Sequence, residues 1–236
     1  MTADPGTPGT RSYLLFDIDG TLMEAEGAGR AALERAYDEA TGIPGAMDGV
    51  VFAGRTDSWI LSEVERTTGV RIDRRSYVPR YLEILEEELD ARNPRALPGV
   101  ADLLERLAAR ENVVLGLCTG NMRAGAFAKL RSTGIDGYFA SGGFGDRHED
   151  RDDITREAAR AIGWTPGAPL AHVGDTEHDI RAAHAIGAAA IGVATGGHDA
   201  DQLREADADL LLGDLTGGEY TVEALLAVAR TVATGA

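Results

Sequence analysis

Apolar runs alternate with helical periodicities over most of the chain. Six short and mostly apolar runs are typical of strands buried on both faces, and patterns with apolar residues every three or four positions lie between them. This order predicts an α/β fold in which helices cover both faces of a parallel sheet. The predicted strands are Tyr13–Phe16, Val113–Cys118, Tyr138–Ala140, Leu170–Val173, Ala189–Val193 and Asp209–Leu212, and the predicted helices are Val100–Arg110, Ala124–Arg131, Ile154–Ile162, Asp179–Ile186 and Tyr220–Val232.

The segment from about Met23 to Asn93 interrupts this alternation. Apart from Val50–Phe52, it contains no strand candidate. We therefore expect a helical insert, residues 23–93, in a core formed by residues 1–22 and 94–236. An insert beside a strand end can close over that edge as a lid, or it can serve as a packing domain. Its predicted helices are Arg30–Thr41, Ser58–Thr68 and Arg75–Ala91.

Two carboxylates, Asp17 and Asp19, follow the first predicted strand directly. A strand that ends there delivers Asp17 to the carboxyl edge of the sheet, where open α/β proteins bind ligands. Such an aspartate can attack an electrophile, and a second one can hold or transfer a proton. Clustered carboxylates also suit Mg²⁺. Calcium loops begin with similar letters, but the twelfth loop position would be Ala28, which cannot bind the ion. A solvated acidic turn is the remaining alternative.

Two further predicted strands end in polar residues. Thr119 follows the second strand, and a hydroxyl beside the free N–H groups of a helix start can hold a phosphoryl group or cap the helix. Gly174 and Asp175 follow the fourth strand, so Asp175 should point off the same edge as Asp17. Asp179 lies one helical turn further on the same face, either as a metal ligand or as an acid favoured by the helix dipole.

These three segments, in this order, resemble motifs one, two and four of the haloacid dehalogenase superfamily, whose members are mostly Mg²⁺-dependent phosphatases. The segment Phe16–Thr21 carries Asp-x-Asp-Gly-Thr, and Gly174–Asp179 carries Gly-Asp-Thr-x-x-Asp. The insert is similar to the family's cap, and Phe52–Asp57 and Leu97–Val100 are similar to the phosphoglycolate phosphatase group. The resemblance covers nearly the whole chain and implies a Rossmann-like core of three layers with a helical cap.

The resemblance also implies a set of site residues. Asp17 would form an aspartyl-phosphate, while Asp19 would protonate the leaving oxygen and then activate water. Thr119 and Arg151 would stabilise the phosphoryl oxygens. The expected Mg²⁺ ligands are Asp17, Asp19 (through its backbone carbonyl), Asp175 and Asp179, and the expected substrate contacts are Gly20, Arg55, Gly120 and Asn121.

The third motif departs from the family's pattern, which usually has a lysine between motifs two and four. Lys129, the only lysine in that interval, comes too early for this role. Arg151 is the candidate, because arginine can bridge carboxylate and phosphate with two hydrogen bonds. Arg147 and Arg156 are its rivals, and a surface salt bridge is the alternative for each of the three.

Arg55 precedes the second helix of the insert, in a loop that can face the core site. An arginine there suits a leaving group that carries a carboxylate or a second phosphate. A surface ion pair with Asp57 is the alternative.

The composition argues against some classes of binding partner. The net charge of −16 and the pI of about 4.7 argue against nucleic acid and anionic membranes, because nothing offsets phosphate repulsion. No apolar run is long enough to cross a bilayer, and Met1–Thr10 lacks an apolar signal core. We expect a cytoplasmic monomer or homodimer with a short disordered start. The single cysteine, Cys118, excludes an internal disulfide and should be a buried thiol.

The histidines do not suggest a zinc site, because His178 and His184 do not share a helix face. His172 should be buried in a strand, and His178 should lie near the site. The resemblance to the superfamily implies an enzyme that hydrolyses a small phosphomonoester. A phosphomutase would share this core and cap, a dehalogenase would usually lack the second aspartate of motif one, and a non-catalytic binding protein could keep the fold.

Overall fold

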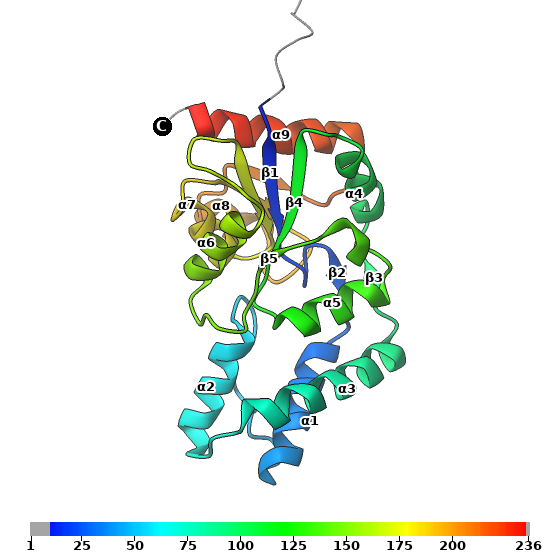
Figure 1. Cartoon of the computed structure of the whole chain (residues 1–236), viewed down its shortest axis with the longest axis vertical. Helices are drawn as coiled ribbons and strands as arrows, with labels where there is room; N and C mark the ends of the chain where they lie inside the picture. The colour runs from blue at the N-terminus through cyan, green and yellow to red at the C-terminus, as the bar shows by residue number, and fades with distance from the viewer. Residues whose placement is uncertain (1–9, 235–236) are drawn as a thin grey trace, which may run out of the picture.

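A six-stranded parallel sheet forms the centre of the structure, a computed structural model that describes residues 10–234 (Figure 1). β1 (Ser12–Phe16) lies between β4 and β6, and Phe16 at its end is level with Leu117 and Val173. This register brings the ends of the three central strands to one edge. The other strands are β4 (Val113–Cys118), β5 (Gly142–Gly143), β6 (Leu170–Gly174), β7 (Ala189–Val193) and β8 (Leu210–Leu212), in the order β5-β4-β1-β6-β7-β8.

Helices cover both faces of this sheet. α4 (Val100–Ala108) and α9 (Glu219–Thr234) pack on one face, and α6 (Arg151–Ala161), α7 (Glu177–His184) and α8 (Ala200–Glu205) pack on the other. Successive residues of β1 enter different cores: Leu14 belongs to one and Leu15 to the other. Each such side chain stabilises the fold by roughly 1.5–3 kcal/mol. The predicted three-layer α/β architecture with a parallel sheet is confirmed.

The predicted insert forms a group of three helices next to the carboxyl edge of the sheet (Figure 1). α1 (Ala28–Thr41) and α3 (Arg74–Arg92) pack along each other, and α2 (Asp57–Thr68) lies beside the loop after β4. Two short antiparallel strands, β2 (Met23–Glu24) and β3 (Arg95–Ala96), lie where the chain leaves and re-enters the core. α5 (Arg123–Ser132) contacts α3, so core and insert meet there as well.

One predicted strand is wrong. Tyr138–Ala140 is not a strand: Asp136–Tyr138 forms a 3₁₀ helix, and the strand is Gly142–Gly143. A Cβ on Gly142 would lie 2.2 Å from the Leu117 carbonyl oxygen, and one on Gly143 would lie 2.1 Å from the Ile154 carbonyl oxygen. Because packing of this strand requires glycine, its sequence has no apolar side chains for a hydrophobic pattern to detect.

The start of β1 and the whole of α9 lie at the end of the molecule away from the insert (Figure 1). In the described part of the chain, no helix combines the length and apolar character needed to cross a membrane. The predicted disordered start over Met1–Thr10 lies, as far as residue 9, outside the described residues.

Candidate active site

A cavity of about 430 Å³ lies between the carboxyl edge of the sheet and the insert. Both parts of the molecule supply its walls, and charged side chains of both signs line it. From the core come Asp17, Asp19, Thr119, Asn121, Lys129, Arg151 and Asp175, and from the insert come Arg30, Phe52, Arg55 and Asp57. The cavity brings together nearly all of the residues that the sequence predicts for the site.

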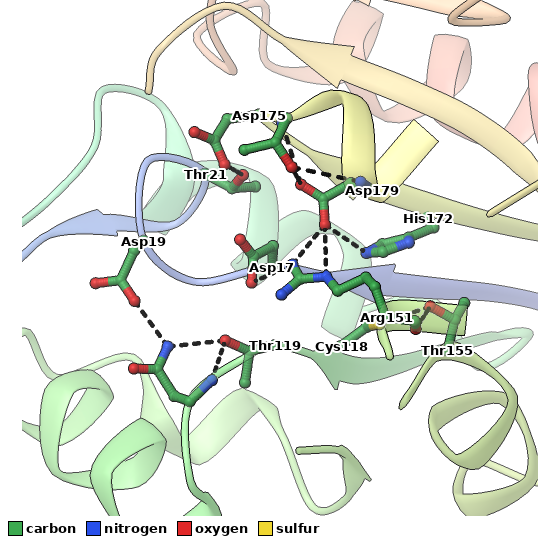
Figure 2. A network of polar contacts seen from close by, with 12 residues as sticks. Asp17, Asp19, Thr21, Cys118, Thr119, Arg151, Thr155, His172, Asp175 and Asp179 are labelled. Atoms are coloured by element: carbon green, nitrogen blue, oxygen red, sulfur yellow. Dashed lines mark hydrogen bonds and ion pairs between the residues drawn. The ribbon is translucent and has the colours of Figure 1, made fainter. Parts of the chain in front are cut away.

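Asp17 lies in a buried cluster of charged groups at the base of this cavity. Figure 2 shows Asp17 and Asp179 beside the guanidinium of Arg151, and Asp175 further away, next to Thr21. Arg151 Nη2 lies 2.9 Å from Asp17 Oδ1 and 2.5 Å from Asp179 Oδ1. Arg151 is the first residue of α6, where Asp150 caps the helix, and its side chain is buried. The arginine that the sequence analysis favours therefore contacts the predicted nucleophile.

Local structure fixes the two acids after β6. Asp179 forms a capping box with Thr176: its Oδ2 accepts the Thr176 N–H at 3.1 Å and the Thr176 hydroxyl at 2.7 Å. Its Oδ1 accepts from Arg151, so both oxygens of Asp179 already have donors. Asp175 Oδ2 accepts the Gly197 N–H at 2.5 Å, and a Cβ on Gly20 would lie 2.5 Å from the same oxygen. Gly20, with φ of 79°, thus leaves room for Asp175.

Burial and mutual repulsion perturb these acids. Burial raises the pKa of Asp17 to about 6, with Asp179 and Asp19 adding to the rise and Arg151 opposing it. Burial also raises the pKa of Asp175 to about 8, with a further contribution from Asp17 and Asp179. Burial acts in the same direction on Asp179, but Arg151, His172 and the hydrogen bond from Thr176 together outweigh it and lower the pKa. Three carboxylates share one guanidinium, so the cluster has a deficit of positive charge when all of them are ionised.

This donor set fits a hard divalent cation. Each of the three acids offers an oxygen, and these oxygens lie within 4.8 Å of one another. Carboxylate oxygens are the protein ligands of Mg²⁺, and a divalent ion would offset the charge deficit. Asp17 and Asp175 have more free oxygen capacity for it than Asp179. Among residues 10–234, the Asp19 side chain is not part of this group, which leaves its backbone carbonyl as the expected ligand.

The Asp19 side chain is held on the other side of the cavity. It lies to one side of the three-acid cluster in Figure 2. Lys129 Nζ donates to both of its oxygens, at 2.8 and 2.7 Å, and Asn121 Nδ2 donates to Oδ2 at 2.7 Å. Asn121 also donates to the buried Thr119 hydroxyl at 2.8 Å. Burial raises the pKa of Asp19, but Lys129 and Asn121 outweigh it and lower the pKa.

The insert is bound to the loop after β4. The Asp57 N–H donates to the Gly120 carbonyl at 2.8 Å, and Asp57 Oδ2 accepts the Met122 N–H at 2.7 Å. The Ser58 hydroxyl donates to the Gly145 carbonyl at 2.5 Å. A Cβ on Gly120 would lie 2.4 Å from the Arg55 carbonyl oxygen, so this approach requires glycine. Burial raises the pKa of Asp57 to about 6, with Asp19 and Asp146 adding to the rise and Lys129 opposing it.

Arg55 belongs to this docked loop and is one of the residues that line the cavity. Its guanidinium stacks on the Trp59 ring, 4.4 Å from the centroid. Within residues 10–234, Arg55 has no carboxylate at ion-pair distance, and Asp57 is bonded to Met122 instead. Arg30 lies over Phe52 at 4.6 Å and adds a second cation on the insert side. The expected alternative, an Arg55–Asp57 ion pair, is therefore not seen.

Sequence reasoning missed two residues of the site. It gave no role to Lys129, which the turn of α5 brings against Asp19, and it considered the carboxylate of Asp57 only as an ion-pair partner of Arg55. His172 is buried as predicted, and burial lowers its pKa to about 4. His178 lies against Gly54 and outside the main cavity. Arg156 is at the surface, paired with Asp153, which removes it as a rival to Arg151.

Comparisons with known proteins agree with this site. The model of the haloacid dehalogenase-like hydrolases matches residues 14–193, which include all three predicted motif segments. A phosphoglycolate phosphatase from Synechococcus elongatus is 28% identical over 201 residues, covering 84% of this chain and 91% of the relative. Among solved structures, a hydrolase from Pseudomonas syringae has a TM-score of 0.65 at 25% identity, covering 91% of this chain and 98% of the other. CbbY from Rhodobacter sphaeroides, in complex with phosphate, has a TM-score of 0.69 at 22% identity, covering 90% and 99%.

Proposed function

This chain belongs to the haloacid dehalogenase-like hydrolases, and on that premise we propose that it is a Mg²⁺-dependent phosphatase acting on a small phosphomonoester. One observation carries the proposal: Asp17 meets Asp175, Asp179 and the buried Arg151 at the base of the cavity. A carboxylate placed there can attack phosphorus while the guanidinium binds the phosphoryl oxygens. The phosphoglycolate phosphatase among the relatives supports the same reaction class.

The proposed reaction proceeds in two steps. An Asp17 oxygen bonds to phosphorus, the bond to the leaving oxygen breaks, and Asp19 gives that oxygen a proton. Water then attacks the phosphorus of the aspartyl-phosphate and gives a proton to Asp19, and the bond to Asp17 breaks to release phosphate. Arg151 and Thr119 stabilise the phosphoryl oxygens. Bound Mg²⁺, held by Asp17, Asp175, Asp179 and the Asp19 carbonyl, would supply charge neutralisation of the nucleophile and the phosphate.

The insert would act as the cap over this reaction. Its loop is bonded to the loop that carries Gly120, so the two loops close the cavity together. Arg55 has no carboxylate partner at ion-pair distance among the described residues, and it lines the cavity from the insert. We therefore propose a substrate whose leaving group is itself anionic, through a carboxylate or a second phosphate.

Release of inorganic phosphate from a panel of phosphorylated metabolites, with Mg²⁺ or with excess chelator, tests this function. We expect release that requires Mg²⁺ and is fastest for esters with an anionic leaving group. Full activity in excess chelator would contradict the metal requirement. Binding of the esters without any phosphate release would favour a non-catalytic protein, and transfer of the phosphoryl group to a sugar would favour a mutase.

A further inference from the structure

Lys129 is the only lysine in the sequence. The chain has 23 lysine and arginine residues, and the other 22 are arginines. Lys129 is also buried, with 4% of its surface exposed, whereas most of the arginines lie at the surface. Within residues 10–234, the cation that contacts Asp19 is this lysine, in a chain that otherwise uses arginine.

The ammonium of Lys129 uses all three of its donors. Two go to the oxygens of Asp19 and the third goes to Asn121 Oδ1, at 2.7 Å. Asn121 closes the triangle with its own bond to Asp19. Three hydrogen bonds thus reach the two carboxylate oxygens of Asp19. The Asp19 side chain is nevertheless 44% exposed. Such charge-assisted bonds fix the orientation of a side chain that would otherwise turn freely.

The ammonium is closely packed on the side of the insert. Gly29, in the first turn of α1, faces Lys129, and a Cβ on Gly29 would lie 2.9 Å from Nζ. A planar guanidinium with five donors is wider than an ammonium and does not simply replace it. The backbone of the insert therefore forms part of the pocket that holds Lys129 against Asp19.

We infer that Lys129 is a positioning residue for the proposed phosphatase: it holds the Asp19 carboxylate toward the water that hydrolyses the aspartyl-phosphate. The inference rests on the proposed function. Lys129 takes no part in bond making. It keeps Asp19 aimed at the second step, in which water forms a bond to phosphorus, loses its proton to Asp19, and the bond from phosphorus to Asp17 breaks. Without it, the first step still proceeds when the leaving group needs no proton from Asp19, as with 4-nitrophenolate, and the second step becomes slow.

Steady-state and burst kinetics with 4-nitrophenyl phosphate separate the two steps. Lys129→Met should lower kcat by roughly a hundredfold, a loss typical of disturbed acid–base catalysis. The value of kcat/KM, which reports the first step, should fall by less than tenfold. A burst of about one nitrophenolate per enzyme should precede the steady state, because the aspartyl-phosphate accumulates. Equal losses in kcat and kcat/KM without a burst, or no loss, would overturn the inference.

Two further variants keep this test decisive. Gly29→Ala favours the helix and displaces only the flexible end of Lys129, so it should fold well and give the same kinetic pattern at roughly tenfold. Arg131→Met changes an exposed cation on the same helix and should leave both constants unchanged. A wild type that releases no nitrophenolate would overturn the proposed function. A normal wild type with an unaltered Gly29→Ala would overturn the role of Lys129 alone.

The ion pair can also be tested without turnover. Labelling with ¹⁵N-lysine gives one Nζ signal, because the chain has one lysine. In the wild type this signal should exchange slowly with water, and in Asp19→Asn it should shift and exchange faster. The same signal in both proteins would mean that Lys129 does not bind Asp19 in solution.

Discussion

Asp17 and Asp19, the two aspartates that follow β1, have different charged neighbours. Asp17 is surrounded by core residues at strand ends, where three acids share one guanidinium. Asp19 is held by α5 and lies against the insert, where one ammonium matches one carboxylate. The first side has a charge deficit that a divalent cation can fill, and the second is neutral by itself. The surroundings of Asp17 thus suit a bond to a charged phosphoryl group with a metal ion present. The surroundings of Asp19 suit proton transfer by a carboxyl group of fixed orientation.

The largest effect should come from Asp17→Asn. An amide is a poor nucleophile, so turnover should fall by at least roughly a thousandfold. The variant removes one charge from the crowded acids, so its melting temperature should not fall. Phosphate release and a thermal melt measure the two effects. Phosphate release at the wild-type rate would mean that the Asp17 side is not where the bond forms.

The next largest effect should be on the Mg²⁺ requirement, which we expect to depend on the acids around Asp17. Asp175→Asn should raise the Mg²⁺ concentration needed for half-maximal activity by roughly a hundredfold or more, beyond the usual loss from an outer partner of a metal site. A Mg²⁺ titration of activity provides the measurement. Asp146→Asn, which changes an exposed acid outside the cavity, provides the control. If both variants behave like the wild type, Asp175 is not a metal ligand.

Asp57→Asn should reveal that the buried carboxylate of Asp57, in the insert, lowers the folding stability in a pH-dependent way. In the folded protein, the Asp57 pKa is raised from 3.8 to about 6, chiefly by burial. A raised carboxyl pKa favours folding while the group is protonated, and this advantage is lost as pH rises from about 4 through 6. Asparagine can still accept the Met122 N–H. Its stability advantage over the wild type should therefore grow by up to about 3 kcal/mol between pH 4 and pH 8.

Chemical denaturation of both proteins across this pH range measures that difference. Asp146 is a matched control, because its Oδ2 accepts the Arg123 N–H at 2.7 Å, one residue from Met122, but its side chain is exposed. Asp146→Asn should show no comparable pH-dependent gain. A constant gap between Asp57→Asn and wild type would show that burial of Asp57 has no energetic cost.

The smallest effect should come from Arg55→Ala. We expect kcat/KM for the best anionic substrate to fall by roughly ten- to a hundredfold, about 1.4–2.8 kcal/mol, with little change for a neutral aryl phosphate. Arg123, which stacks on Phe127 and Phe144 outside the cavity, gives a matched control in Arg123→Ala. Equal losses on both substrates, or none on either, would remove Arg55 from substrate recognition.

The Asp17 side was predictable from sequence, whereas the Asp19 side was predictable only in part. Parallel strands end at one edge, so Asp17 and Asp175 could be placed together from strand patterns alone. Lys129 reaches Asp19 only through the docking of α5, and Asp57 reaches Met122 only through the docking of the insert. Neither docking leaves a periodic signal. The glycine strand β5 and the two-residue strands β2 and β3 likewise lack the apolar alternation that identifies a strand.

The position of the described chain ends has a practical consequence. β1 starts, and α9 runs, at the end of the molecule away from the insert (Figure 1). An affinity handle, a fluorophore or a second protein joined through either end would hang from the face remote from the cavity. The chain can therefore be tethered to a surface with its cavity free.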